Sequence, residues 1–145
     1  MESSLKQFKG VSITPLEKVN HPKGDVFHAL KCTENSFSKF GEAYFTTINH
    51  GHTKGWKKHK EMVMNLVVPV GQVGFYFFQE NKSAFTSAGI GNYVRITVQP
   101  NIWMAFEGLG ENLNLVLNLA SLTHDPLEAI NVDIKSFPLH NHEVK

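Results

Sequence analysis

The 145-residue chain has little cysteine, little arginine and no long apolar run, and each shortage excludes a class of protein. Cys32 is the single cysteine. It rules out a disulfide framework and a multi-cysteine zinc site, and it favours a reducing, cytoplasmic setting. No apolar run approaches the roughly 18 residues of a membrane span, and no apolar stretch follows the lysines near Met1. We therefore expect neither a membrane segment nor a signal peptide.

The charge is nearly balanced, because 14 basic side chains face 13 acidic ones and leave a net charge of +1. This balance argues against a nucleic-acid partner, which requires a broad basic field. The basic residues are uneven in type, with one arginine, Arg95, and eight histidines. They are also uneven along the chain, because four lysines fall in the segment from Lys54 to Lys60. Hydrophobic residues make up 41% of the chain, and charged residues only 19%. One globular domain is the expected organisation.

Short runs of β-branched, aromatic and aliphatic residues alternate with glycine, proline and asparagine turns, which is typical of strands rather than helices. We predict an all-β single domain, a barrel or sandwich, with residues 1–20 as an N-terminal extension and 137–145 as a flexible tail that holds His140 and His142. A short helical turn is expected at 126–130. The predicted strands cover residues 43–48, 62–70, 72–79, 93–98, 102–106 and 113–119.

The strand at 113–119 shows the clearest alternation, with leucine at every second position. The pattern places Leu113, Leu115, Leu117 and Leu119 in the core. Asn118 then lies on the opposite face of the strand, where it can line a polar pocket. Residues 67–70 and 73–78 are predicted to form a tight hairpin around Gly71. Both strands are apolar on both faces, which indicates that both faces are covered, as in a sandwich or barrel whose outer face meets a partner chain. The segment 81–91 is expected to be a loop that shapes the pocket.

Residues 50–61 form the densest polar segment, so function is sought there first. If the segment is extended, Lys57 and His59 share one face while Trp56 and Lys58 share the other. One interpretation is a solvated basic edge that discourages strand pairing. The other is an anion site, in which ammonium groups grip a phosphate or diphosphate and Gly55 allows close backbone approach.

Other polar or aromatic candidates leave alternatives open. His50 and His52 lie in a glycine turn without a nearby carboxylate, which is weak evidence for a metal, so no metal is predicted. Arg95 is either a partner within the fold or a bidentate grip on phosphate or carboxylate. Trp103 is either a core or rim aromatic or a stacking surface for a sugar or base.

Several stretches, in their order and spacing, resemble one protein family. The chain from about residue 22 to 133 is similar to the small cupin-fold sugar-nucleotide epimerases related to dTDP-4-dehydrorhamnose 3,5-epimerase. The matching stretches are Lys23-Gly24-Asp25-Val26-Phe27-His28, Phe40-Gly41-Glu42-Ala43-Tyr44-Phe45, Lys54-Gly55-Trp56-Lys57-Lys58-His59, Val70-Gly71-Gln72-Val73, Val98-Gln99-Pro100-Asn101-Ile102-Trp103, Asn118-Leu119-Ala120 and His124-Asp125-Pro126.

The resemblance implies a jelly-roll homodimer that binds a nucleoside-diphosphate sugar at the barrel mouth, without a cofactor. It also implies a role in making deoxysugars or surface polysaccharides such as lipopolysaccharide. Most of the catalytic set is substituted. Lys54 stands at the position of the diphosphate-binding arginine and Lys57 at that of the histidine base. The remaining three positions, of the assisting lysine, the tyrosine acid and a turn histidine, fall near Met64, Asn118 and Met104.

Epimerisation beside a ketone requires a base near neutrality and a donor for the enolate oxygen. His59 is the preferred base because an imidazole titrates near neutral pH, and Lys57 is the alternative. Asn118 or Tyr44 is expected to hold the sugar oxygen. The candidates for substrate binding are Lys54, Trp56, Lys23, His28, Arg95, Asn65 and Trp103.

Three functions follow from these residues. The first is a nucleotide-sugar epimerase or isomerase that exchanges the proton beside the ketone. The second is a binding module that keeps the nucleotide-sugar pocket but has lost the chemistry. The third is a metal-dependent cupin.

Overall fold

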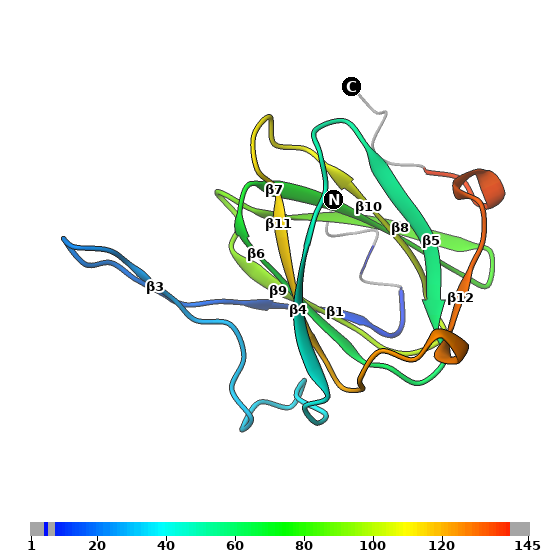
Figure 1. Ribbon diagram of the computed structural model, residues 1–145, viewed down its shortest axis with the longest axis horizontal. Helices are drawn as coiled ribbons and strands as arrows, with labels where there is room; N and C mark the ends of the chain where they lie inside the picture. Colours follow the sequence, from blue (N-terminus) through cyan, green and yellow to red (C-terminus); the bar gives the residue numbers. More distant parts are fainter. Residues whose placement is uncertain (1–4, 6–7, 140–145) are drawn as a thin grey trace.

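The computed structural model describes residue 5 and residues 8–139, and shows two antiparallel sheets packed face to face with a projecting hairpin (Figure 1). The strands are β1 (Val11–Pro15), β2 (Lys18–Val19), β3 (Val26–Phe27), β4 (Glu42–Thr47), β5 (Thr53–His59), β6 (Met64–Val70), β7 (Gln72–Gln79), β8 (Lys82–Gly89), β9 (Val94–Val98), β10 (Trp103–Gly108), β11 (Leu115–Ala120) and β12 (Ala129–Asn131). Two 3-10 turns, η1 (Pro126–Glu128) and η2 (Ile134–Ser136), flank β12.

Each main sheet has five strands. The β4 sheet has the order β1-β9-β6-β11-β4, and the β5 sheet has the order β12-β5-β10-β7-β8. Most neighbours within a sheet are distant in sequence, which is the connectivity of a jelly roll. The predicted all-β cupin-like sandwich is confirmed. The short helical turn expected at 126–130 is present at 126–128 as η1, whereas residues 129 and 130 belong to β12.

The expected hairpin around Gly71 is wrong, because β6 and β7 belong to different sheets. Gly71 has a φ of +85°, and a Cβ there would lie 2.3 Å from the carbonyl oxygen of Leu113. The Asn114 carboxamide oxygen accepts a hydrogen bond from Gln72 N at 2.9 Å and fixes the corner. The chain therefore crosses between sheets at this glycine instead of folding back.

The expected loop at 81–91 is also wrong over most of its length. Residues 82–89 form β8, which pairs with β7 from Gln79↔Lys82 to Gln72↔Gly89. Glu80 and Asn81 turn the chain with φ values of 50° and 64°. In the run Ser83-Ala84-Phe85-Thr86-Ser87-Ala88, only Phe85 and Thr86 are of the aromatic or β-branched types that are typical of strands. Its extended form follows from hydrogen bonding to β7.

β11 has the predicted alternation with its faces reversed. Leu113 is 52% exposed and Leu115, Leu117 and Leu119 are only half-buried, whereas Asn114, Val116, Asn118 and Ala120 point inward. Asn114 explains the reversal, because its amide nitrogen donates to the carbonyls of Ile48 and Gly110 at 3.1 and 2.9 Å. These partners lie inside, so the leucines face outward.

Both ends of the described chain are better packed than expected. Residues 11–15 form β1, which pairs with β9, so this part of the expected extension belongs to the sandwich. Phe137 packs against Phe78 and Trp56, with ring centroids 4.3 and 5.5 Å apart. Phe137 and Leu139, at the start of the predicted tail, thus pack against the outer face of the β5 sheet. His140 and His142 lie outside the described residues. Within the described part, no helix is long and apolar enough to cross a membrane.

Candidate functional site

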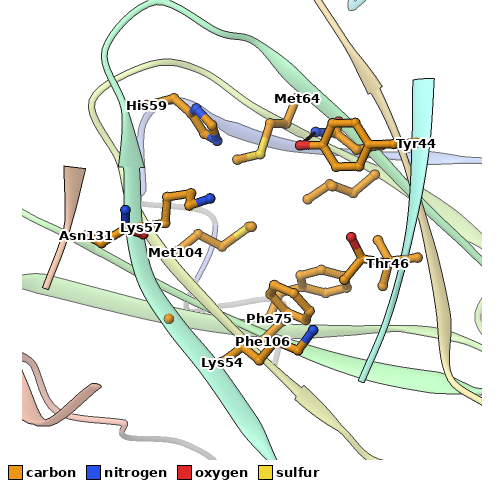
Figure 2. A pocket seen from close by; sticks show the side chains of 14 residues that line it. Tyr44, Thr46, Lys54, Lys57, His59, Met64, Phe75, Met104, Phe106 and Asn131 are labelled. Carbon is orange, nitrogen blue, oxygen red and sulfur yellow. Dashed lines mark hydrogen bonds between the residues drawn. The ribbon is translucent and has the colours of Figure 1, made fainter. Parts of the chain in front are cut away.

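A cavity of about 320 Å³ lies between the two sheets (Figure 2). Seven strands contribute to it, and one part of the wall is apolar while another carries basic, hydroxyl and amide groups. The lining residues are Tyr44, Thr46, Lys54, Gly55, Lys57, His59, Met64, Leu66, Phe75, Met104, Phe106, Val116, Asn118 and Asn131. This combination of apolar walls and a few polar groups is typical of a small-molecule site.

His59 stands at the end of β5 and is paired with a carboxylate. Its Nδ1 lies 2.8 Å from Oε1 of Glu128. The two residues are only 7% and 8% exposed. Glu128 Oε2 accepts two further hydrogen bonds, from Glu61 N at 2.9 Å and Met62 N at 2.8 Å. The carboxylate is therefore held by three donors from the segment that contains the histidine.

These contacts determine the protonation of the pair. Burial of Glu128 raises the pKa of its carboxyl, but the hydrogen bonds from His59 and from two backbone amides lower the pKa more, and the net shift is downward. Glu128 is then an ionised acceptor that holds a proton on Nδ1 of His59. Nε2 remains as the ring nitrogen available to accept a proton at the cavity wall.

Glu128 is absent from the sequence-based candidates, although the turn that carries it was predicted. Asp125 caps η1 by accepting from Leu127 N at 3.0 Å, and Pro126 begins the turn, so Glu128 is delivered to its end. The Asp-Pro-x-Glu pattern at 125–128 is the feature of the sequence that could have indicated Glu128 as a candidate. Nothing local in the sequence indicates a partner 69 residues away.

Two lysines of β5 also face the cavity. Lys57 lies opposite Asn131 of β12 and Met104 of β10 in the strand register. Nζ of Lys54 donates to the carbonyl oxygen of Thr47 at 2.9 Å and lies 5.8 Å from the Phe106 ring centre. Neither lysine is in an ion pair with any described residue. Their charges are available to an anionic ligand.

Tyr44 and Asn118 approach from the opposite sheet. They are register partners on β4 and β11, and Asn118 Nδ2 donates to the Tyr44 hydroxyl at 2.9 Å. Figure 2 shows Tyr44 and His59 on opposite sides of the cavity. The structure thus brings together all four residues expected to be catalytic, His59, Lys57, Asn118 and Tyr44, with Lys54 beside them.

The positions carried over from the resemblance also converge. Lys54, Lys57, Met64, Met104 and Asn118 all line the same cavity. Gly55 lies among them, with a φ of +146°, and a Cβ there would lie 2.5 Å from Ala105 Cβ. The glycine therefore permits close packing of β5 on β10.

The two tryptophans lie outside the cavity lining. Trp56 is completely buried on the other face of β5, and its Nε1 donates to Ile134 O at 2.9 Å. Trp103 packs on Phe137 at 5.3 Å, with Nζ of Lys58 4.9 Å above its ring. Both belong to the outer face of the β5 sheet, which the segment 132–139 covers. Their positions do not support the expected roles in substrate binding.

Arg95 and Asn65 belong to a buried polar cluster on the outer face of the β4 sheet. The guanidinium is completely buried and reaches Ala29 O at 2.7 Å, Ser36 Oγ at 2.6 Å and Glu34 Oε1 at 3.2 Å. Asn65 Oδ1 accepts from Arg95 Nε at 3.1 Å. This arginine anchors residues 29–36 to the sheet. Of the two interpretations offered for Arg95, the contacts favour a partner within the fold over a grip on a ligand.

The remaining substrate-binding candidates are on or next to the projecting hairpin. Lys23 lies between β2 and β3, and His28 follows β3; neither lines the cavity. Figure 1 shows the hairpin projecting from the sandwich. His50 Nδ1 lies 3.0 Å from Gly110 O. Within residue 5 and 8–139, no group of three or more histidine, cysteine, aspartate and glutamate side chains is placed to hold a metal ion.

No protein-family model matches the sequence, and no curated protein matches it. Solved structures do. A dTDP-sugar isomerase from Desulfovibrio desulfuricans G20 has a TM-score of 0.83 and 26% identity, over 88% of this chain and 87% of that one. QdtA, a sugar 3,4-ketoisomerase from Thermoanaerobacterium thermosaccharolyticum solved with TDP, has a TM-score of 0.75 and 18% identity over 86% and 89%.

An epimerase shares the fold as well. NovW, a 4-keto-6-deoxy sugar epimerase from Streptomyces spheroides, has a TM-score of 0.78 and 13% identity, over 88% of this chain and 71% of that one. The resemblance to sugar-nucleotide epimerases stated from the sequence is therefore confirmed in three dimensions, because this chain has the fold that dTDP-sugar isomerases and epimerases share.

Proposed function

We propose that this protein is an enzyme that isomerises or epimerises a nucleoside-diphosphate-linked 4-keto deoxysugar by exchanging the proton on a carbon beside the ketone. The buried His59–Glu128 pair at the wall of an otherwise largely apolar cavity is the observation that carries the proposal. The solved proteins described above are a dTDP-sugar isomerase, a sugar 3,4-ketoisomerase bound to TDP and a 4-keto-6-deoxy sugar epimerase, and they support the same class of substrate.

In the proposed mechanism, Nε2 of His59 removes the proton from the carbon beside the ketone. The electron pair of that C–H bond forms an enolate, whose oxygen is held by the hydroxyl of Tyr44 on the opposite sheet. Glu128 stabilises the imidazolium that results and keeps the ring oriented. Epimerisation is completed when the same carbon takes up a proton on its opposite face. Isomerisation is completed when the former ketone carbon takes up the proton, its oxygen is protonated to a hydroxyl, and the hydroxyl on the neighbouring carbon loses its proton to become the new ketone.

Lys54 and Lys57 are proposed to bind the diphosphate. Both line the cavity, and among the described residues neither has a carboxylate partner, so the charge of a diphosphate would be neutralised without displacing an internal ion pair. Charge-assisted hydrogen bonds from ammonium groups to phosphate oxygens are among the stronger polar interactions in proteins. We assign Lys57 to diphosphate binding and not to the role of base, because His59 and not Lys57 has a carboxylate partner that can stabilise its protonated form.

We further propose a cytoplasmic homodimer that serves the synthesis of deoxysugars for surface polysaccharide such as lipopolysaccharide. The dimer is supported by exposed apolar side chains on the outer face of β4 and β11 and on the hairpin β2–β3. Phe45 is 64% exposed, Leu113 52% and Val26 53%. Nucleotide sugars are cytoplasmic metabolites, and the exposed, unpaired Cys32 suits a reducing compartment.

Solvent exchange tests the function. The protein is incubated in D₂O with a panel of nucleoside-diphosphate-linked 4-keto-6-deoxyhexoses, and deuterium at the carbons beside the ketone is followed by NMR. We expect incorporation with at least one member and a fall of at least about 10²-fold for His59→Asn, because a positioned base contributes that much. His52→Asn is the matched control, since His52 is exposed and outside the cavity lining.

Two results would contradict the proposal. Absence of deuterium incorporation across a panel whose members bind would leave only the binding module. Exchange that survives in His59→Asn would remove this residue from the role of base, even if the enzyme class were right.

A further inference from the structure

Asn118 carries the one buried side-chain oxygen or nitrogen atom, among the described residues, that has no hydrogen-bond partner. The atom is its carboxamide oxygen, Oδ1. The side chain is 3% exposed and lines the cavity. Buried carbonyl oxygens are almost always hydrogen-bonded, and each exception requires an explanation. At a cavity wall, the simplest explanation is a donor that arrives with the ligand.

The orientation of the Asn118 amide follows from its neighbours. Nδ2 lies 2.9 Å from the Tyr44 hydroxyl and 4.0 Å from the sulfur of Met62. A thioether sulfur can only accept a hydrogen bond, so it faces the amide nitrogen and not the oxygen. The carboxamide oxygen is therefore the atom left for the ligand.

The same orientation determines what Tyr44 can do. Because its hydroxyl oxygen accepts from Asn118, its own proton is available for another acceptor, and it donates to no described residue. The cavity wall thus presents a hydroxyl donor and a carbonyl acceptor side by side, from register partners on adjacent strands. A ligand that satisfies both groups carries an acceptor next to a donor.

We propose that Tyr44 and Asn118 together recognise an α-hydroxy ketone: Tyr44 donates to the ketone oxygen, and Asn118 accepts from the hydroxyl on the neighbouring carbon. This inference rests on the proposed function and adds a substrate requirement to it. Asn118 acts as a positioning residue, because it orients the phenol and reads the hydroxyl without exchanging a proton with carbon. Sugars that lack the hydroxyl beside the ketone are poor substrates.

A comparison of two substrates tests the requirement. The rate of deuterium incorporation beside the ketone gives kcat/KM for dTDP-4-keto-6-deoxyglucose and for its analogue without the 3-hydroxyl. The wild type is expected to prefer the hydroxylated sugar. In Asn118→Leu this preference falls by about tenfold, the cost of a buried polar group left unpaired. Intrinsic differences in C–H acidity cancel, because only the change in preference between proteins is compared.

Two further variants separate the roles. Asn118→Asp keeps an acceptor, so it retains the preference, while its carboxylate attracts the Tyr44 proton and slows both substrates. Tyr44→Phe removes the donor to the ketone and slows both substrates equally. Asn118→Ala, which only removes atoms, replaces the leucine variant if thermal unfolding shows that leucine is not accommodated.

The outcomes are distinguishable. If the wild type exchanges neither these two sugars nor any other member of the panel, the proposed function fails. If the wild type exchanges the sugars but Asn118→Leu and Asn118→Ala keep the full preference for the hydroxylated one, the inference is overturned and the proposed function stands.

Discussion

At the scale of single residues, the partner of His59 decides which ring nitrogen is available for chemistry. Glu128→Gln keeps the shape of the side chain, but its carbonyl oxygen would remain with the amides of Glu61 and Met62 and turn the NH₂ group toward Nδ1. The imidazole would then carry its proton on Nε2 and could not act as a base. We expect the exchange rate to fall by about 10²- to 10⁴-fold, measured with the substrate used for His59→Asn.

The same variant has a signature in stability. The pKa of Glu128 is lowered in the fold, so its carboxylate stabilises the protein above the ordinary pKa of 4.5, and this contribution is lost as the pH falls through the folded value. The stability difference between wild type and Glu128→Gln, measured by urea unfolding, should therefore be largest near neutral pH and shrink below 4.5. A difference that grows as the pH falls would contradict the ionised state of Glu128.

Part of the site could be predicted from single residues. The parity of an extended segment correctly placed Lys57 and His59 together and Trp56 on the other face. Glu128 could not be predicted, because its contact with His59 depends on how β12 returns to β5. The role of Arg95 was also beyond the sequence, since its partners are carbonyl and hydroxyl groups of a distant loop.

At the scale of elements, the alternation of leucines at 113–119 predicts a strand, but it does not determine which face of that strand points to the core. The period of two is local, whereas the direction is decided by Asn114 and its buried partners on other segments. β8 was missed for a related reason. Apart from Phe85 and Thr86, its side chains are of types that give a weak strand signal, and its extended conformation follows from pairing with β7.

The reversed β11 leaves an apolar outer face on the β4 sheet, which tests the proposed dimer. Phe45 on β4 lies opposite Leu117 on β11 in the register and is 64% exposed. Phe45→Glu should convert a dimer into a monomer, because it puts a charge in the centre of an apolar contact. Light scattering after size exclusion would show the mass falling from twice to once the chain mass of 16.3 kDa.

Ile90→Glu is the matched control, since Ile90 is 78% exposed in the turn between β8 and β9 and lies on neither β4 nor β11. It should leave the mass unchanged. A monomeric wild type, or a dimer that persists in Phe45→Glu, would exclude this face as the interface.

At the scale of the whole molecule, the two sheets enclose a cavity whose basic groups all come from one strand, β5. β5, next to the edge of its sheet, supplies Lys54, Lys57 and His59, while β4, the edge of the other sheet, supplies Tyr44. Other strands supply apolar side chains to the wall, including Met64 from β6 and Phe75 from β7. The cavity thus carries the positive charges of Lys54 and Lys57, which have no carboxylate partner among the described residues, and this suits an anionic ligand with a less polar sugar end.

The central claim is that the sugar of a nucleotide sugar lies in this cavity with a ring carbon facing His59. A crystal structure of the complex with dTDP-glucose, which has no ketone and does not react, tests it most directly. We predict the hexose inside the cavity, a ring carbon within about 3.5 Å of Nε2 of His59, and the diphosphate beside Lys54 and Lys57. A hexose bound outside the cavity, for example in the shallow cleft beside Arg95, would contradict the account.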